Sequence, residues 1–190
     1  MRPLPIATLI LALGAAARPA AAQDEKDRTR CAQTVDLFKQ TDPTLEKYFT
    51  SAVGYAVFPS IGKGAFVVGG AGGSGCLYEH GAILGKAKMV QVTVGLQLGG
   101  QSYAELIFFQ NADAIEAFKS NSLELSAQVS AVAAASGASA NAKYRLGVLV
   151  FTLAKTGLMY EASVGGQKFS FKPAAPDSTA KAGTDTGKKD

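Results

Sequence analysis

A stretch in which apolar and polar residues alternate constrains the fold of this chain more than any other feature of its sequence. From residue 89 to 98, valine or leucine occupies every second position, and glutamine, threonine or glycine stands between them. Successive side chains of a β-strand point to opposite faces, so this period of two predicts a half-buried antiparallel strand. We expect Val90, Val92, Val94, Leu96 and Leu98 to face the core, and Gln91, Thr93, Gly95 and Gln97 to face away from it.

Helical spacing occurs in three places. Apolar residues recur three or four apart over residues 29–40, after a charged segment at 24–30 that we expect to be frayed. Asp42 followed by Pro43 predicts the start of a second helix, because aspartate caps and proline suits the first turn. Asn111 is a suitable cap for a third helix, whose apolar face would carry Ala114, Ile115 and Phe118.

The remaining patterns predict short strands joined by tight turns. Strands are expected at residues 55–58 (ending at Pro59), 65–68, 81–88, 101–109 and 146–153, with a last hairpin formed by 158–164 and 168–171. Residues 127–136 also alternate but consist of small residues. The sum is an α+β fold. It has an antiparallel, strongly curved or barrel-like sheet of about seven or eight strands, two N-terminal helices and one inserted helix.

The N-terminus predicts export. Arg2 precedes an apolar run at residues 6–17, and alanines at 20–22 fit a signal-peptidase site with cleavage after Ala22. The run is shorter than the roughly 20 residues that span a bilayer. We therefore expect a signal peptide at 1–22, one domain at 23–171 and a disordered tail at 172–190. The mature protein would be periplasmic or peripherally associated with the outer membrane.

Charge and cysteine content narrow the functional classes. The formal charge of +4 falls to about +2 once Arg2 and Arg18 leave with the signal peptide, which argues against a nucleic-acid-binding protein. The two cysteines, Cys31 and Cys76, allow either a disulfide or two small buried apolar residues. Sequence alone leaves both alternatives open.

Catalytic and cofactor motifs are weak in this sequence. Gly70, Gly72 and Gly75 match the spacing of the dinucleotide fingerprint, but β alternation rather than a helix follows them, so we interpret them as a strand crossing where side chains do not fit. His80, the only histidine, has no metal-ligand partners at suitable spacing and is interpreted as a turn residue. Glu105 is interpreted as solvent-facing or ion-paired. We predict no enzyme activity, no metal and no cofactor.

Several separate motifs, in order, resemble the SYLF domain family. They are Gly-Tyr-Ala-Val-Phe-Pro at 54–59, the segment around Lys63, the glycines at 69–75, residues 95–101, residues 108–118 and the glycine-containing segments at 155–159 and 165–166. The resemblance spans roughly residues 31–171. It implies lipid binding, and for an exported bacterial protein it implies anionic phospholipids or a membrane surface as partners.

Basic residues near predicted turns and strand ends are the candidates for head-group contacts. These are Lys63, Lys86, Lys88, Arg145 and Lys155, together with Lys143. Lys63 lies within a family motif and is the first choice, so Lys63→Glu is expected to weaken binding to anionic vesicles. The leading hypothesis is a non-enzymatic lipid-binding domain of the cell envelope. The second is a structural or protein-interaction domain that binds envelope proteins, and the third an enzyme that uses Glu105 or His80.

Overall fold

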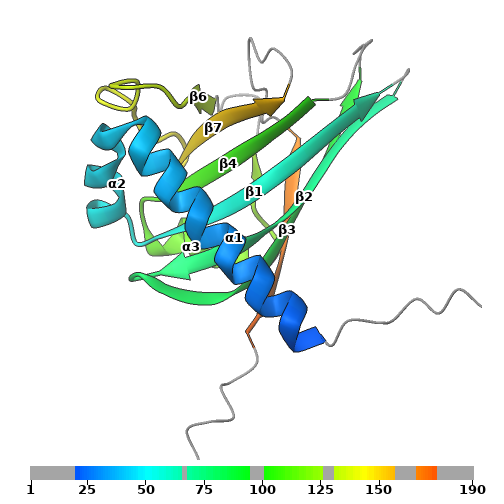
Figure 1. Cartoon of the computed structure of the whole chain (residues 1–190). Helices are drawn as coiled ribbons and strands as arrows, with labels where there is room; N and C mark the ends of the chain where they lie inside the picture. The colour runs from blue at the N-terminus through cyan, green and yellow to red at the C-terminus, as the bar shows by residue number, and fades with distance from the viewer. Residues whose placement is uncertain (1–19, 66–67, 95–100, 126–130, 157–165, 175–190) are drawn as a thin grey trace, which may run out of the picture.

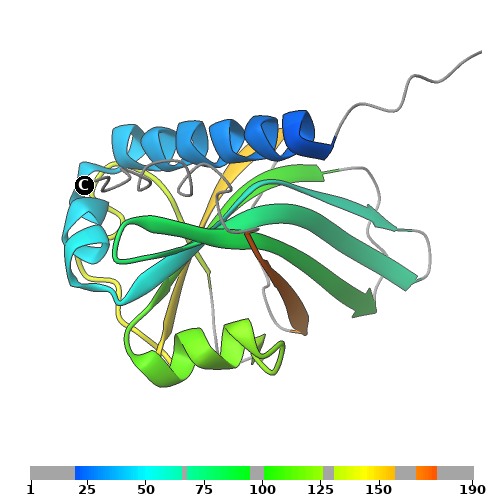
Figure 2. The same ribbon diagram turned by 90° about the horizontal axis from the view of Figure 1, so that it is seen from below.

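One curled sheet forms the centre of the protein, with helices on both of its faces (Figures 1 and 2). The computed structural model describes residues 20–65, 68–94, 101–125, 131–156 and 166–174. Its strands are β1 (Gly54–Ala65), β2 (Val68–Glu79), β3 (Ala82–Val94), β4 (Gln101–Phe109), β5 (Glu124–Leu125), β6 (Ala131–Ala133), β7 (Val148–Thr156) and β8 (Gln167–Pro173). They lie in the order β5-β8-β3-β2-β1-β4-β7-β6. Among these strands β6 and β7 pair in parallel and the other neighbours are antiparallel. The predicted α+β class and curved sheet are confirmed.

The helices cover opposite faces of this sheet. α1 (Ala20–Thr41), the 3₁₀ turn η1 (Pro43–Leu45) and α2 (Glu46–Ser51) lie on one side, and α3 (Ala112–Lys119) lies on the other (Figure 2). Both predicted caps are confirmed: the Asp42 carboxylate accepts a hydrogen bond from the Thr44 amide at 3.1 Å, and Asn111 accepts one from the Ala114 amide at 3.0 Å.

Helix α1 is longer than the sequence pattern predicted. It begins at Ala20, so the segment at 24–30 is helical rather than frayed. The cause is tertiary: Asp24 and Asp27 on this segment both form ion pairs with Lys86 on β3. A helical pattern read from apolar spacing alone does not register such contacts, because they join residues far apart in the sequence.

Two apolar cores result, one on each face of the sheet. The core under α1 and α2 is built around Phe38, Leu45, Tyr48, Val57, Leu106, Phe108 and Phe151. The core inside the curl, covered by α3, is built around Phe58, Ile61, Leu77, Met89, Ile107, Phe109, Ile115, Phe118 and Phe169. Burial of Ala114, Ile115 and Phe118 confirms the predicted apolar face of α3.

The alternation in β3 was recognised, but it was assigned to the wrong faces. Val90 is 60% exposed, whereas Gln91 is 2% and Met89 1% exposed. The period of two determines that neighbours face opposite ways, but it does not say which face meets the core. Here the inside of the curl takes up buried polar side chains. They are Gln91, Tyr103, Glu105, Thr152 and Gln167.

The glycine-rich segment is a strand, as its interpretation required, and it continues as β2 to Glu79 instead of opening a helix. A Cβ atom on Gly75 would collide with the carbonyl oxygen of Val57 on β1. Across from it, β1 runs on through Pro59, where a turn was predicted, because an irregularity in the pairing between Val57 and Ser60 accommodates the proline.

Other strand boundaries also differ from the predicted ones. The segments 81–88 and 89–98 were expected as two elements, but β3 runs unbroken over Ala82–Val94. In the alternating segment at 127–136, the described residues include the short strand β6. The expected hairpin segment 158–164 lies outside the described residues; β8 pairs with β3 and β5 and extends to Pro173.

Candidate functional site

Lysines gather on the outward face of β3 and β8, the face that also carries Val90. Lys86 and Lys88 alternate with the buried Ala87 and Met89, so their side chains point away from the interior of the curl. Lys86 lies opposite Lys172 of β8 in the antiparallel register. Side chains opposite one another in such a pair are close, so the two strands present a group of cations on one surface.

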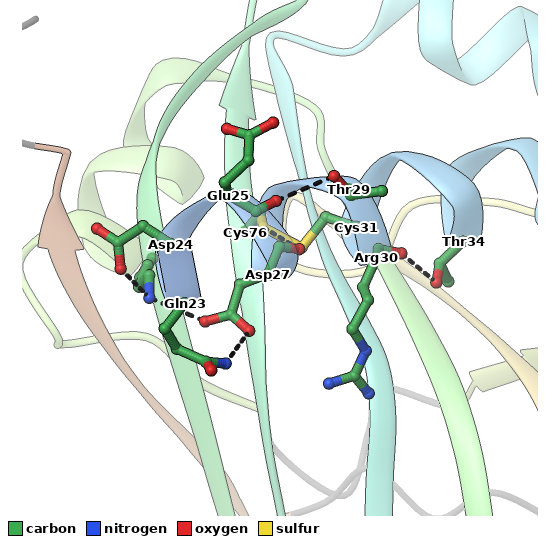
Figure 3. The surroundings of a disulfide bond; sticks show 10 residues. Gln23, Asp24, Glu25, Asp27, Thr29, Arg30, Cys31, Thr34 and Cys76 are labelled. Atoms are coloured by element: carbon green, nitrogen blue, oxygen red, sulfur yellow. Dashed lines mark hydrogen bonds and ion pairs between the residues drawn. A yellow bond between two sulfur atoms is a disulfide. The ribbon is translucent and has the colours of Figure 1, made fainter. Parts of the chain in front are cut away.

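Helix α1 brings further charges over the same surface, and a disulfide attaches it there. Cys31 of α1 is bonded to Cys76 of β2, which decides between the two alternatives that the sequence left open (Figure 3). Figure 3 shows Asp24, Asp27 and Arg30 on one side of α1, as expected for residues three apart on a helix. This side overlooks β3.

Two hollows flank the first turns of α1. The smaller, of about 220 Å³, is lined by Arg30, Lys86 and Lys88 together with Asp27 and the disulfide residue Cys31. The larger, of about 390 Å³, is lined by Arg28, Lys86, Lys88 and Lys172 together with Asp24 and Asp27. We call the two hollows and their five basic residues (Arg28, Arg30, Lys86, Lys88 and Lys172) the cationic groove.

Lys86 lies at the centre of this groove and is partly neutralised. Its ammonium group contacts Asp24 and lies 2.8 Å from Oδ2 of Asp27. Hydrogen bonds to these two carboxylates raise the pKa of Lys86. Burial acts to raise the pKa of Asp27, but the hydrogen bonds from Lys86 and Gln23 outweigh it and leave that pKa lowered. Lys86 and Asp27 are therefore both charged at neutral pH, and the other basic residues of the groove take part in none of the ion pairs found among the described residues.

The predicted head-group residues do not converge on one rim. Lys86 and Lys88 lie together in the groove. Arg145 and Lys155 are both exposed, but they lie at opposite ends of β7, Arg145 just before it and Lys155 near its far end. Lys63 lies in β1 opposite Ala71 and Gln101 in the register, and its side chain is outside the described residues.

The two residues considered for catalysis lie in different surroundings. His80 occupies the tight turn between β2 and β3, exposed and with φ of 50°, which confirms its interpretation as a turn residue. Glu105 is fully buried inside the curl, so its interpretation as solvent-facing was wrong. Its carboxylate accepts a 2.9 Å hydrogen bond from Nε2 of Gln167, which holds it within the polar part of the interior.

Two known groups of sequences are similar to this chain, one a protein family and one a single bacterial protein. Residues 90–178 match the sequence model of the Ysc84 (SYLF) family, described as "Las17-binding protein actin regulator". This match covers slightly less than half of the chain and supports the resemblance to the SYLF family over these residues. A protein of Aeromonas veronii called Beta cell expansion factor A is 28% identical over 138 residues, which cover 71% of this chain and 51% of that protein. The chain thus spans about half the length of this curated relative.

The SYLF match begins inside β3, at Val90, and runs past the end of β8. Lys172 therefore lies within the matched segment, whereas Lys86, Lys88 and the whole of α1 precede it. SYLF domains are a family of binding domains, so a groove with charged walls is a more suitable candidate site than a catalytic centre.

Sequence reasoning missed Arg28, Arg30 and Lys172 as members of the groove. Arg28 was assigned to a frayed segment, Arg30 to the overlap of that segment with the predicted helix at 29–40, and Lys172 to the tail. The sequence did contain one indication for Lys172. Lys168, Ser170 and Lys172 are spaced two residues apart, so a strand at these positions would place all three side chains on one face. The pairing of β8 with β3, which brings Lys172 to Lys86, is a long-range contact that this signal does not contain.

Proposed function

We propose that this chain is a non-enzymatic lipid-binding domain that recognises the phosphate of anionic phospholipid head groups through the cationic groove. The observation that carries the proposal is the convergence of five basic side chains, from α1, β3 and β8, on two adjoining hollows. The match of residues 90–178 to the SYLF family, whose members are binding domains, supports the same class of function.

The groove suits a head group better than an acyl chain. Its hollows are at or below the small end of the volumes typical of ligand pockets, and basic side chains line both of them. Phosphodiester oxygens accept charge-assisted hydrogen bonds from arginine and lysine. Each basic residue near an anionic membrane surface contributes about 1 kcal/mol of attraction.

We propose further that the protein is exported and acts at the cell envelope, where phosphatidylglycerol and cardiolipin would be the anionic lipids. The signal-like residues 1–22 and the disulfide, which is typical of oxidising compartments, support this location. Within the described residues no helix has the length and apolar character needed to cross a membrane. Contact through the surface groove requires no such helix.

A protein partner is the second candidate. The description of the family names binding to a protein, Las17, and the exposed Val90 lies among the lysines of the outward face of β3. A partner would then be an acidic protein of the envelope that covers this face. The two candidates predict different results with vesicles made of lipid alone: a lipid-binding domain would bind to them, and a protein-binding domain would not.

Flotation with liposomes separates the two candidates. The protein is mixed with vesicles of phosphatidylcholine alone, or of phosphatidylcholine with phosphatidylglycerol or cardiolipin, at about 0.05 M and 0.5 M salt. Head-group recognition predicts flotation with the anionic vesicles only, lost at high salt because exposed charges are then screened within a few ångströms. Failure to float with either kind of vesicle would contradict the proposal and favour a protein partner.

A further inference from the structure

A tight hairpin turn just before β7 holds a leucine in an unfavourable backbone conformation. Arg145 and Val148 exchange backbone hydrogen bonds of 2.8 and 3.0 Å across the two residues between them. Those residues, Leu146 and Gly147, have φ angles of 51° and 77°. Two positive φ angles in a two-residue loop define a type I′ turn, whose first position favours asparagine, aspartate or glycine. An L-residue with a branched apolar side chain is disfavoured there.

The strain at Leu146 is not offset by burial. Its side chain is 69% exposed, the highest value among the exposed large apolar residues of the described chain. The equivalent turn between β2 and β3 has the same geometry, with His80 and Gly81 at φ of 50° and 80°, and places a polar residue at the first position. The fold therefore accepts a polar residue in such a turn. A strained, exposed leucine points to a function outside the folding of the chain itself.

Cations flank this leucine. The ring of Tyr144 packs edge-on against Tyr48, with the ring centres 6.0 Å apart, so it points into the core under α2. Its neighbours Lys143 and Arg145 are both exposed. An apolar side chain at the tip of a rigid turn, with a basic residue on each side of the preceding tyrosine, has the character of a membrane contact. Protein interfaces of ordinary size need a larger apolar patch than one side chain supplies.

We propose that the tip formed by Arg145 to Val148 inserts into the bilayer, with Leu146 entering the boundary between head groups and acyl chains. Lys143 and Arg145 would contact lipid phosphates around it. Interfacial residues of this kind combine apolar burial with attraction to anionic lipids. This inference rests on the proposed lipid-binding function, but it concerns a different surface from the cationic groove and is tested separately from it.

The first test exploits the absence of tryptophan from the chain. Leu146→Trp introduces a single fluorophore at the tip, and Leu37→Trp introduces one at an exposed position of α1. On adding vesicles of phosphatidylcholine and phosphatidylglycerol, we expect a blue shift and quenching by brominated acyl chains for Leu146→Trp only. If both variants float with the vesicles but neither is quenched, the insertion is refuted while the proposed function stands. If the unaltered protein does not float, both fail.

A second variant separates a role of Leu146 in membrane binding from a role in the stability of the fold, because the two roles predict different changes in vesicle affinity and melting temperature. Leu146→Asn replaces the leucine by a residue that tolerates positive φ, so the melting temperature is expected to stay the same or rise by about 2 °C. Affinity for the same vesicles should nevertheless fall by about tenfold, because an apolar side chain no longer leaves water. Leu37→Gln is the matched control and should bind as the unaltered protein does. Equal binding by Leu146→Asn and the unaltered protein would overturn the inference.

Discussion

The carboxylate of Asp27 on α1 lies 2.8 Å from the ammonium group of Lys86 on β3, in the middle of the cationic groove. Asp24, one turn earlier on the helix, contacts the same lysine. These two carboxylates occupy the position that a lipid phosphate would take next to Lys86. An arriving head group must therefore compete with the protein's own acidic side chains.

Removing that competition should strengthen lipid binding. In Asp24→Asn/Asp27→Asn we expect an affinity for phosphatidylglycerol vesicles about tenfold higher, because Lys86 becomes available and two like-charged groups leave the site. Glu25→Gln/Asp36→Asn removes the same charge from exposed positions of α1 away from Lys86 and should change affinity by about twofold at most. Equal gains in the two double variants, measured by flotation titration, would mean that net charge alone controls binding.

The disulfide should make a large contribution to stability. Cys31 and Cys76 are 45 positions apart, and closing a loop of that size restricts the unfolded chain by an amount usually worth about 2–4 kcal/mol. Reduction should therefore lower the urea midpoint of unfolding, and Cys31→Ala/Cys76→Ala should show a similar midpoint that no longer responds to reductant. A midpoint of the unaltered protein that is insensitive to reductant would contradict this expectation.

Asp42 should give the fold a characteristic sensitivity to acid. Burial acts to raise the pKa of its carboxyl group, but hydrogen bonds from Thr44 and Ser139 outweigh burial and lower that pKa from 3.8 to about 2. Because the folded-state pKa lies below the unfolded one, the stabilisation is fully present above about pH 4 and is lost as the pH falls through 2.

The loss attributable to Asp42 between pH 5 and pH 2 is expected to be about 2 kcal/mol. The carboxylate also accepts amide hydrogen bonds from Gly137 and Ser139, so Asp42→Asn should destabilise the protein at pH 5. Urea unfolding of both proteins at the two pH values isolates the effect. The variant should lose less stability on acidification; parallel losses would show that Asp42 does not titrate as described.

The assignment of faces in β3 is open to a direct test by neighbouring substitutions. Met89→Ala removes a side chain packed inside the curl and should lower the free energy of unfolding by about 2–5 kcal/mol. Val90→Ser changes an exposed side chain and should alter it by about 0.5 kcal/mol or less. The reverse order of effects would mean that the valine face is buried after all.

This strand also illustrates what local sequence reasoning supplies. Alternation identified β3 and the caps at Asp42 and Asn111 located two helix starts, because each is a local property of the backbone. The choice of face depended on Tyr103, Glu105 and Gln167, which come from β4 and β8 and make one part of the interior polar. Such an interior has no signature within β3 itself.

The candidate site was predictable to a smaller extent. Lys86 and Lys88 were recognised as candidate contacts, but Arg28 and Arg30 come from a segment expected to be frayed, which overlaps a predicted helix at Arg30, and Lys172 comes from the expected tail. Their convergence depends on the disulfide to α1 and on the pairing of β8 with β3, both of which join positions distant in the sequence. Arg145 and Lys155 are basic like the groove residues, but they lie at β7 rather than at β3 and β8, so sequence alone did not separate them from the groove residues.

The most direct test of the lipid-binding account removes two groove cations that form none of the ion pairs described above. Lys88→Gln/Lys172→Gln is compared with Lys39→Gln/Lys47→Gln, which alters lysines near the end of α1 and in α2 and carries the same net charge. In flotation titrations with phosphatidylglycerol vesicles at low salt, the groove variant should bind about 30-fold more weakly than the unaltered protein, while the control stays within about threefold of it. Equal affinities for the two double variants would contradict head-group recognition by the groove.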